Sequence, residues 1–151
     1  MLETHEIHEA FESSRHAVVF PGDCLELLRS IPNGAIQLVV TSPPYNIGKE
    51  YETRLDLQTY LAQQAQVIRE CVRVLSPQGS ICWQVGNYVD NGSIIPLDTI
   101  LYPVFRDLGL KMRNRIVWHF EHGLHCHRRF SGRYETIIWF TKSDDYVFGL
   151  D

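Results

Sequence analysis

The chain has 151 residues, 44% of them apolar and 21% charged, a composition typical of one ordinary globular domain. No apolar run approaches the ~18 residues of a membrane span, and residues 1–6 are acidic where a secretory signal is basic and then apolar. We therefore expect a cytoplasmic protein. The net charge of -4 does not by itself indicate a nucleic-acid binder. The four cysteines form no C-x-x-C pair, so we expect reduced, mostly buried thiols rather than a zinc ribbon or a disulfide scaffold.

Regular patterns begin after a polar lead-in over residues 1–15. Residues 17–20 are a short apolar run typical of a strand, and Asp23 followed by Glu26 forms a capping box that opens a short helix. Residues 36–40 form a nearly continuous apolar strand, of the kind buried on both faces of a sheet. Two prolines follow at once, so this strand ends in a fixed, irregular turn.

A long amphipathic helix and three further strands follow. Apolar residues recur every three or four positions over residues 57–75, with Asp56 as the N-cap and residues 76–79 closing the helix. Residues 80–85 predict a strand, 90–92 a polar turn, and 96–108 a helix that Pro103 kinks and Gly109 ends. Residues 110–120 and 134–141 predict two more strands. This alternation predicts an α/β fold, a doubly wound sheet of about five strands with a parallel core and helices on both faces.

The turn over residues 41–46 reads Thr-Ser-Pro-Pro-Tyr-Asn and lies where such sheets bind ligands, at the carboxyl end of a buried strand. The prolines lack N–H groups, so the turn offers backbone carbonyls and the Ser42 hydroxyl as acceptors. An amine held by the Ser42 oxygen and the Pro43 carbonyl would delocalise less into its ring and become a better nucleophile. Tyr45 supplies a flat face for stacking. A proline-rich strand end without catalytic function is the alternative.

A basic segment separates the last two predicted strands. Residues 111–133 carry six Lys or Arg against one acid, with four histidines interleaved, a local net charge of +5 that suits phosphate. A solvated loop of mixed charge fits the same count. The histidines and Cys126 match no tetrahedral spacing, so we expect no metal site.

Residues 41–46 resemble the signature of the DNA amino-methyltransferases: an acidic, amide or serine residue, then Pro-Pro and an aromatic, directly after a buried strand. Other blocks of this family resemble residues 22–28, 75–79, 85–87, 116–118 and 133–142. The resemblance covers nearly the whole chain and implies part of the doubly wound, Rossmann-like sheet of S-adenosylmethionine-dependent methyltransferases. Residues 16–151 are then the catalytic half of a methyltransferase domain.

The resemblance implies an activity on double-stranded DNA. A base is flipped out of the duplex, stacks on Tyr45 and is held through its amine by Ser42 and the Pro43 carbonyl, in a turn completed by Pro44, while it attacks the methyl group of S-adenosyl-L-methionine. Serine before Pro-Pro resembles the cytosine N4 enzymes more than the adenine N6 enzymes, so cytosine N4 is favoured and adenine N6 is the alternative. No cysteine follows a proline, as the attacking thiol of the carbon-5 cytosine enzymes does.

Further site residues also follow from the resemblance. Asp23, Cys24 and Thr41 are expected to bind the cofactor, although Asp23 serves equally as a helix N-cap. Glu135 either forms a salt bridge with Arg133 or positions the loop that faces DNA. The residues expected at the nucleic acid are Asn46, Arg128, Arg129 and Arg133.

One family element is missing. The ten glycines include no Gly-x-Gly, whereas the family holds the methionine end of the cofactor on a Phe-x-Gly-x-Gly loop. We therefore expect a fragment, or one part of a split enzyme whose second polypeptide carries this loop, so that the chain alone binds the cofactor poorly and exposes an unpaired strand edge. The alternatives are a non-catalytic DNA-binding remnant and an enzyme that methylates RNA or a protein side-chain amide.

Overall fold

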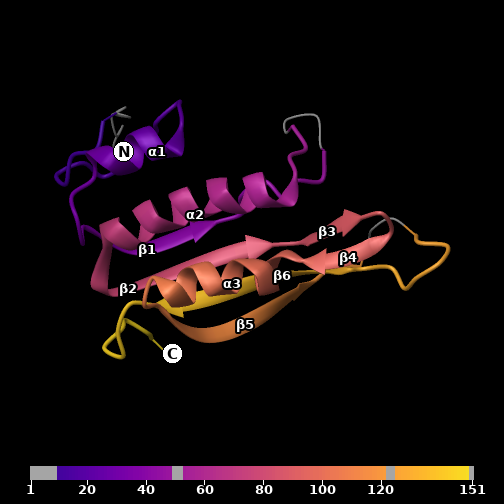
Figure 1. Ribbon diagram of the computed structural model, residues 1–151. Coiled ribbons are helices and arrows are strands. Elements are labelled where there is room, and N and C mark those ends of the chain that lie inside the picture. The colour runs from indigo at the N-terminus through magenta and orange to yellow at the C-terminus, as the bar shows by residue number, and fades with distance from the viewer. Residues whose placement is uncertain (1–9, 49–52, 122–124, 150–151) are drawn as a thin grey trace, which may run out of the picture.

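The computed structural model describes residues 10–48, 53–121 and 125–149 of the chain (Figure 1). The described elements follow the predicted alternation of strands and helices. In chain order they are α1 (Cys24–Ser30), β1 (Ile36–Thr41), α2 (Leu57–Val74), β2 (Leu75–Val85), β3 (Asn87–Asp90), β4 (Ser93–Pro96), α3 (Leu97–Asp107), β5 (Lys111–His119) and β6 (Tyr134–Thr141).

The main sheet has four strands in the order β1-β2-β6-β5. β1 runs parallel to β2, with Val39 opposite Ile81, whereas β6 runs antiparallel to both of its neighbours. The short strands β3 and β4 form a separate hairpin. Its turn holds Asn91 and Gly92 at positive φ, 46° and 83°, as the predicted polar turn requires. The parallel core is therefore the β1–β2 pair, and the reversed strand β6 lies between β2 and β5.

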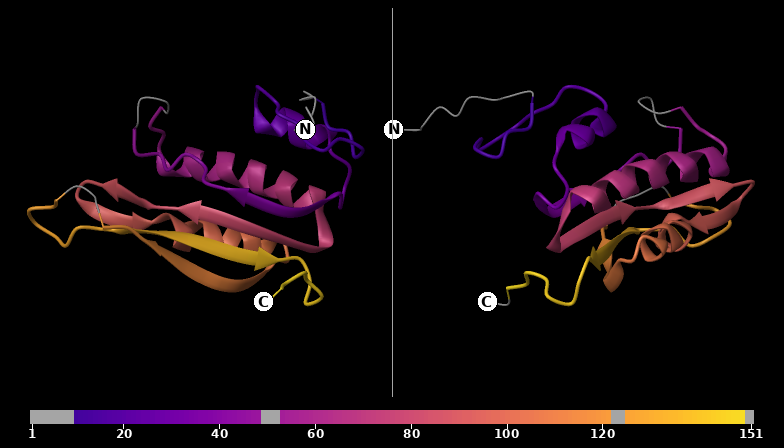
Figure 2. Two further views of the ribbon diagram at one scale, coloured as in Figure 1. Left: turned by 180° about the vertical axis from the view of Figure 1, so that it is seen from behind. Right: turned by 60° about the vertical axis from the view of Figure 1, so that its left-hand side comes forward.

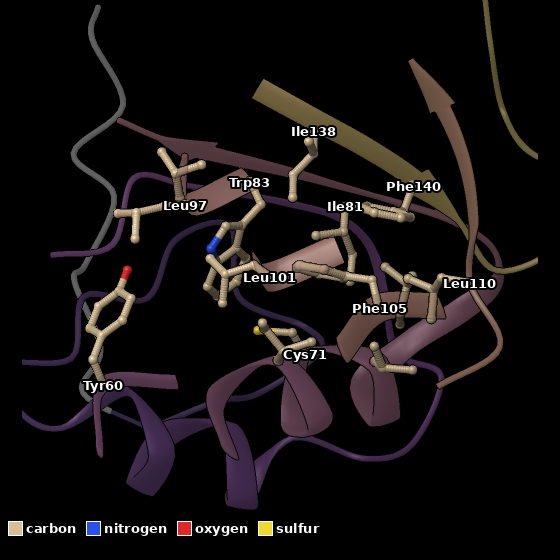
Figure 3. Close-up of a cluster of buried hydrophobic side chains, with 14 of the residues drawn as sticks. Tyr60, Cys71, Ile81, Trp83, Leu97, Leu101, Phe105, Leu110, Ile138 and Phe140 are labelled. Atoms are coloured by element: carbon tan, nitrogen blue, oxygen red, sulfur yellow. The ribbon is translucent and has the colours of Figure 1, made fainter. Parts of the chain in front are cut away.

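Both long helices pack on the same face of this sheet. Side chains from α2, α3, β2 and β6 form one buried cluster, which Figure 3 shows converging between helices and strands. The Phe105 ring stacks on Phe140 with centroids 4.5 Å apart, and Trp83 meets Phe105 edge-on at 5.6 Å. α1 lies on the helical side as well, because the Arg73 guanidinium of α2 donates to the carbonyls of Leu28 and Ile31.

No described helix covers the other face of the sheet, which is turned toward the viewer in the left view of Figure 2. Leu38 and Val40 are 55% and 69% exposed there. The stacked rings of Trp139 and Phe148, 5.3 Å apart, border a hollow of about 590 Å³ on this face. The expectation that residues 36–40 are buried on both faces is thus wrong for the described residues, and the expected helices are found on one face only. Among the described strands, β1 lies at the edge of the sheet and pairs only with β2.

Several local predictions need adjustment. The expected strand at residues 17–20 is reduced to an isolated bridge at Val18, and these residues belong to neither of the two described sheets. Residues 76–79 do not form a loop after α2, since β2 already begins at Leu75. Of the four free cysteines only Cys71 is buried; Cys82 and Cys126 are half-buried and Cys24 is exposed. Within the described ranges, no helix combines the length and apolarity that crossing a membrane requires.

The one-sided packing predicts different costs for the same substitution on two neighbouring strands. Val85 is fully buried among the core side chains, whereas Val40 lies on the uncovered face. We expect Val85→Ala to lower the free energy of unfolding by about 2 kcal/mol through lost burial and a residual cavity. Val40→Ala should change it by less than about 0.5 kcal/mol. Urea denaturation of the two variants measures both values, and equal losses would contradict this packing.

Candidate active site

The Ser-Pro-Pro turn and the basic loop emerge at the same end of the sheet. Thr41, the last residue of β1, pairs with Trp83 near the carboxyl end of β2, and the turn follows directly. β5 runs in the same direction as β2, because both are antiparallel to β6. The segment between β5 and β6 therefore leaves the sheet at the same end as the turn, as Figure 1 shows, although β1 and β5 are its opposite edges. The sheet thus brings the two predicted functional segments to one of its ends.

The two proline carbonyls of the turn differ in their contacts with the described residues. The Pro44 carbonyl accepts a hydrogen bond of 3.0 Å from the Tyr60 hydroxyl of α2. No donor among the described residues reaches the Pro43 carbonyl. Ser42 is exposed, and its hydroxyl oxygen lies next to this carbonyl in the chain. The Ser42 oxygen and the Pro43 carbonyl are therefore the acceptors that the turn offers to a ligand.

Tyr45 is anchored at both ends of its side chain. Its hydroxyl oxygen lies 2.8 Å from Ser42 Oγ and donates to Glu135 Oε2 at 3.0 Å. Gln84 Nε2 donates to the same carboxylate oxygen at 2.5 Å. The ring lies so close to Gly86 that a Cβ there would approach Tyr45 Cδ2 to 3.1 Å. Burial raises the pKa of Tyr45, and the Glu135 carboxylate raises it further, so the phenol keeps its proton at neutral pH.

Asn46 closes the loop behind the turn. It is only 2% exposed and adopts the left-handed conformation, φ 59°, that asparagine tolerates. Its side-chain amide donates to the Leu55 carbonyl at 2.8 Å and accepts from the Leu55 N–H at 2.7 Å. Asp56 follows and caps α2 by accepting from the Thr59 N–H at 2.9 Å. The Asn46 side chain, which we expected at the nucleic acid, is therefore engaged in holding the loop.

The expected cofactor residues lie apart from the turn, except for Thr41. Asp23 caps α1, where one carboxylate oxygen accepts from the Leu25 N–H at 2.8 Å while the side chain stays exposed. An exposed carboxylate suits a ribose hydroxyl. Cys24 is exposed overall, but partial desolvation of its thiol and the neighbouring Asp23 carboxylate raise its pKa. α1 packs against the end of α2 remote from the turn, so no described contact joins Asp23 or Cys24 to Ser42.

The basic loop presents free cations and exposed rings. Arg128 and Arg129 are exposed and have no acidic partner within the described residues. Phe130, next to them, is completely exposed. Arg133 is half-buried, and its carbonyl accepts from the Phe120 N–H at 2.9 Å, which closes the base of the loop. The described residues contain no group of three or more His, Cys, Asp or Glu side chains placed to hold a metal ion.

The site contains residues whose contacts the sequence did not predict. Glu135 binds Tyr45 and Gln84 and forms no salt bridge with Arg133 among the described contacts. Gln84 belongs to the predicted strand at residues 80–85, and Gly86 to the block at residues 85–87 that resembles the family. Neither residue was assigned a role in the site. The sequence signal for Phe130 was its place beside two arginines.

Comparison with known proteins gives the family. Residues 36–151 match the sequence profile of the DNA methylase family. The chain is 49% identical over 148 residues to the type II methyltransferase M.BglII of Bacillus subtilis, covering 97% of this chain and 41% of M.BglII. It thus spans about two fifths of that relative.

Two solved structures share the fold. The protein TTHA0409 of Thermus thermophilus, solved in complex with S-adenosyl-L-methionine, superimposes with a TM-score of 0.70 and 27% identity over 97% of this chain and 59% of its own. The cytosine-N4-specific PvuII DNA methyltransferase superimposes with a TM-score of 0.71 and 24% identity over 84% of this chain and 49% of its own. With the family profile matched over most of its length, the chain belongs to the DNA methylase family of N6 and N4 amino-methyltransferases.

Proposed function

We propose that this chain is the catalytic half of an enzyme that methylates the exocyclic amine of a base flipped out of double-stranded DNA. The observation that carries the proposal is the pair of acceptors at the carboxyl end of β1. These are Ser42 Oγ, which keeps lone pairs beside its hydrogen bond with Tyr45, and the Pro43 carbonyl, which no donor among the described residues reaches. Membership of the DNA methylase family supports an amine on a base as the ligand of this pair. The exposed Arg128 and Arg129 of the basic loop, at the same end of the sheet, suit the phosphates of a duplex.

The two acceptors activate the amine. An exocyclic amine of cytosine or adenine has two N–H groups and a lone pair that is delocalised into the ring. Donation of both N–H groups to Ser42 Oγ and the Pro43 carbonyl holds the nitrogen still and draws electron density toward it. S-adenosyl-L-methionine supplies an electrophilic methyl group when bound. The half-buried Tyr45 ring, whose Cδ2 and Cε2 lie close to Gly86, is proposed to stack on the base.

Cytosine N4 is the favoured target, and adenine N6 is the alternative. Ser42 is neutral and offers a single oxygen, as in the cytosine enzymes that the turn resembles, whereas Asp or Asn at this position is usual in the adenine enzymes. The acceptor pair suits either amine chemically. The preference for cytosine therefore rests on Ser42 alone.

A further segment completes the cofactor site in this proposal. The chain spans 41% of M.BglII, and the described residues contain no glycine-rich helix start that could hold the cofactor's charged methionine end. We propose that Asp23 binds the ribose of the cofactor and that Cys24 and Thr41 contact the cofactor nearby. The free edge of β1 and the exposed Leu38 and Val40 supply a surface for the completing segment, whether on the same chain or on a second polypeptide.

Removal of the Ser42 hydroxyl tests the acceptor pair. In the active protein that contains this chain, Ser42→Ala should lower the single-turnover rate of methyl transfer about 10- to 100-fold, because one amine hydrogen bond is lost at the reacting nitrogen. Ser93→Ala, on the exposed start of β4, is the matched control and should keep the parent rate. An unchanged rate in Ser42→Ala would refute the acceptor role.

A methyl group at Gly86 tests the position of Tyr45. Gly86→Ala places a Cβ 3.1 Å from Tyr45 Cδ2 and 3.3 Å from Cε2, so the ring must shift by a few tenths of an ångström. We expect weaker capture of the flipped base, measured by the fluorescence of a 2-aminopurine placed at the target position. Gly149→Ala, with open space around its Cβ, is the control. Equal base capture in both variants would show that the ring does not contact the base.

Salt dependence tests the basic loop. If Arg128 and Arg129 each neutralise one phosphate, replacing both with alanine should reduce the slope of log affinity against log salt by up to about 0.9 for each contact. Arg106→Ala removes a cation that is already paired with Asp107 and should leave the slope unchanged. Titration of labelled duplex at several salt concentrations measures the slopes. A double variant with the parent's slope would contradict phosphate binding by these arginines.

A further inference from the structure

Glu135 lies behind the acceptor pair although it is 90 residues away from Tyr45 in the chain. It is half-buried near the start of β6, opposite Trp118 of β5. One oxygen, Oε2, accepts from both the Tyr45 hydroxyl and the Gln84 amide. The carboxylate therefore has two donors that belong to the turn and to the end of β2, and both contacts join elements that are distant in sequence.

The hydrogen bonds among Ser42, Tyr45 and Glu135 determine which hydroxyl donates in each contact. A carboxylate has no proton and can only accept, whereas a tyrosine hydroxyl has one proton to donate. Tyr45 gives its proton to Glu135 Oε2. In the 2.8 Å contact between Tyr45 and Ser42, the Ser42 hydroxyl must then be the donor. Its proton points away from the ligand side, and the remaining lone pairs of Ser42 Oγ are left to accept.

We propose that Glu135 is a positioning residue that acts through Tyr45 to hold the Ser42 hydroxyl as a hydrogen-bond acceptor. The assignment rests on the proposed function, because it gives the ligand class of the same site. With Ser42 Oγ and the Pro43 carbonyl both accepting, the site pairs with an amine. A base that places a carbonyl oxygen there, as thymine or guanine does, faces two acceptors and finds no donor.

Three further features keep the Tyr45 hydroxyl donating to Glu135. Burial keeps the phenol protonated by raising the pKa of Tyr45, so Tyr45 retains the single proton that it donates to Glu135. We call this series of hydrogen bonds, from Ser42 to Tyr45 to Glu135, the relay. Gln84 donates to the same oxygen and fixes the carboxylate in place without supplying a competing charge. Arg133, the nearest cation in sequence, forms no ion pair with Glu135 among the described contacts, so the carboxylate is committed to the turn.

The test removes each member of the relay in the active protein that contains this chain. Tyr45→Phe keeps the ring and loses the hydroxyl, and Glu135→Leu keeps the size and loses the acceptor. We expect each to lower the single-turnover methyl-transfer rate about 10- to 100-fold, with the dissociation constants of DNA and cofactor within about twofold of the parent. Glu135→Gln, whose amide oxygen can still accept from Tyr45, should recover most of the rate. Glu12→Leu, at an exposed carboxylate paired with Arg15, is the matched control.

The double variant separates positioning from a merely structural role. Because Glu135 acts through the Tyr45 hydroxyl, Glu135→Leu added to Tyr45→Phe should lower the rate by less than about a further twofold. The parent should also bind a duplex carrying the target amine at least about tenfold more tightly than one with a carbonyl oxygen in its place, and both single variants should narrow this ratio.

Three results would overturn the proposal: parent rates in both single variants, losses that multiply in the double variant, or an unchanged binding ratio. If the parent methylates DNA amines but the variants give one of these results, the positioning role of Glu135 is refuted and the proposed function stands. A parent that methylates no base amine would refute the proposed function as well.

Discussion

Two prolines placed directly after a parallel strand determine where the proposed acceptor pair of this chain lies. β1 is paired with β2 up to Thr41, and Pro43 and Pro44 cannot continue the ladder because they lack N–H groups. The chain must leave the sheet at its carboxyl end, with carbonyls that strand pairing no longer uses. Tyr60 takes the Pro44 carbonyl and leaves that of Pro43 beside the Ser42 hydroxyl. An acceptor pair is thus a direct consequence of the way the strand ends.

The rest of the described structure holds this turn in place. α2 contributes Tyr60 and is itself tied to the turn through Asn46 and Leu55. The core between the sheet and the two long helices fixes β2 and β6. β6 supplies Glu135, which accepts from the Tyr45 hydroxyl, and β2 supplies Gln84, which donates to the same Glu135 oxygen. Because side chains alternate along a strand, Gln84 and Glu135 share the face of Cys82 and Trp139, which is the uncovered face of the sheet, at the end where the turn leaves β1. The contacts that hold Tyr45 are all made between described residues.

Sequence patterns predicted the local parts of this arrangement. The strand at residues 36–40, the apolar stripe of α2 and the caps at Asp23 and Asp56 each depend on neighbouring residues, and each is found. Long-range relations could not be inferred in this way. The approach of Glu135 to Tyr45 depends on the reversed direction of β6. Whether residues 17–20 pair as a strand depends on residues elsewhere in the chain, which periodicity does not reveal, and only a bridge at Val18 forms. Asn46 was expected at the nucleic acid, yet its side-chain amide forms two hydrogen bonds with the backbone of Leu55.

The claim that the turn over residues 42–45 accepts an exocyclic amine is tested most directly by the position of the methyl group in the product. Duplex DNA treated with the active protein and isotopically labelled S-adenosyl-L-methionine can be digested to nucleosides and analysed by mass spectrometry. The acceptor pair predicts the label on an exocyclic nitrogen, with N4-methylcytosine the expected product. N6-methyladenine would change the base while preserving the amine chemistry. Label on carbon 5 of cytosine, or on a ring nitrogen, would contradict the role assigned to Ser42 and Pro43.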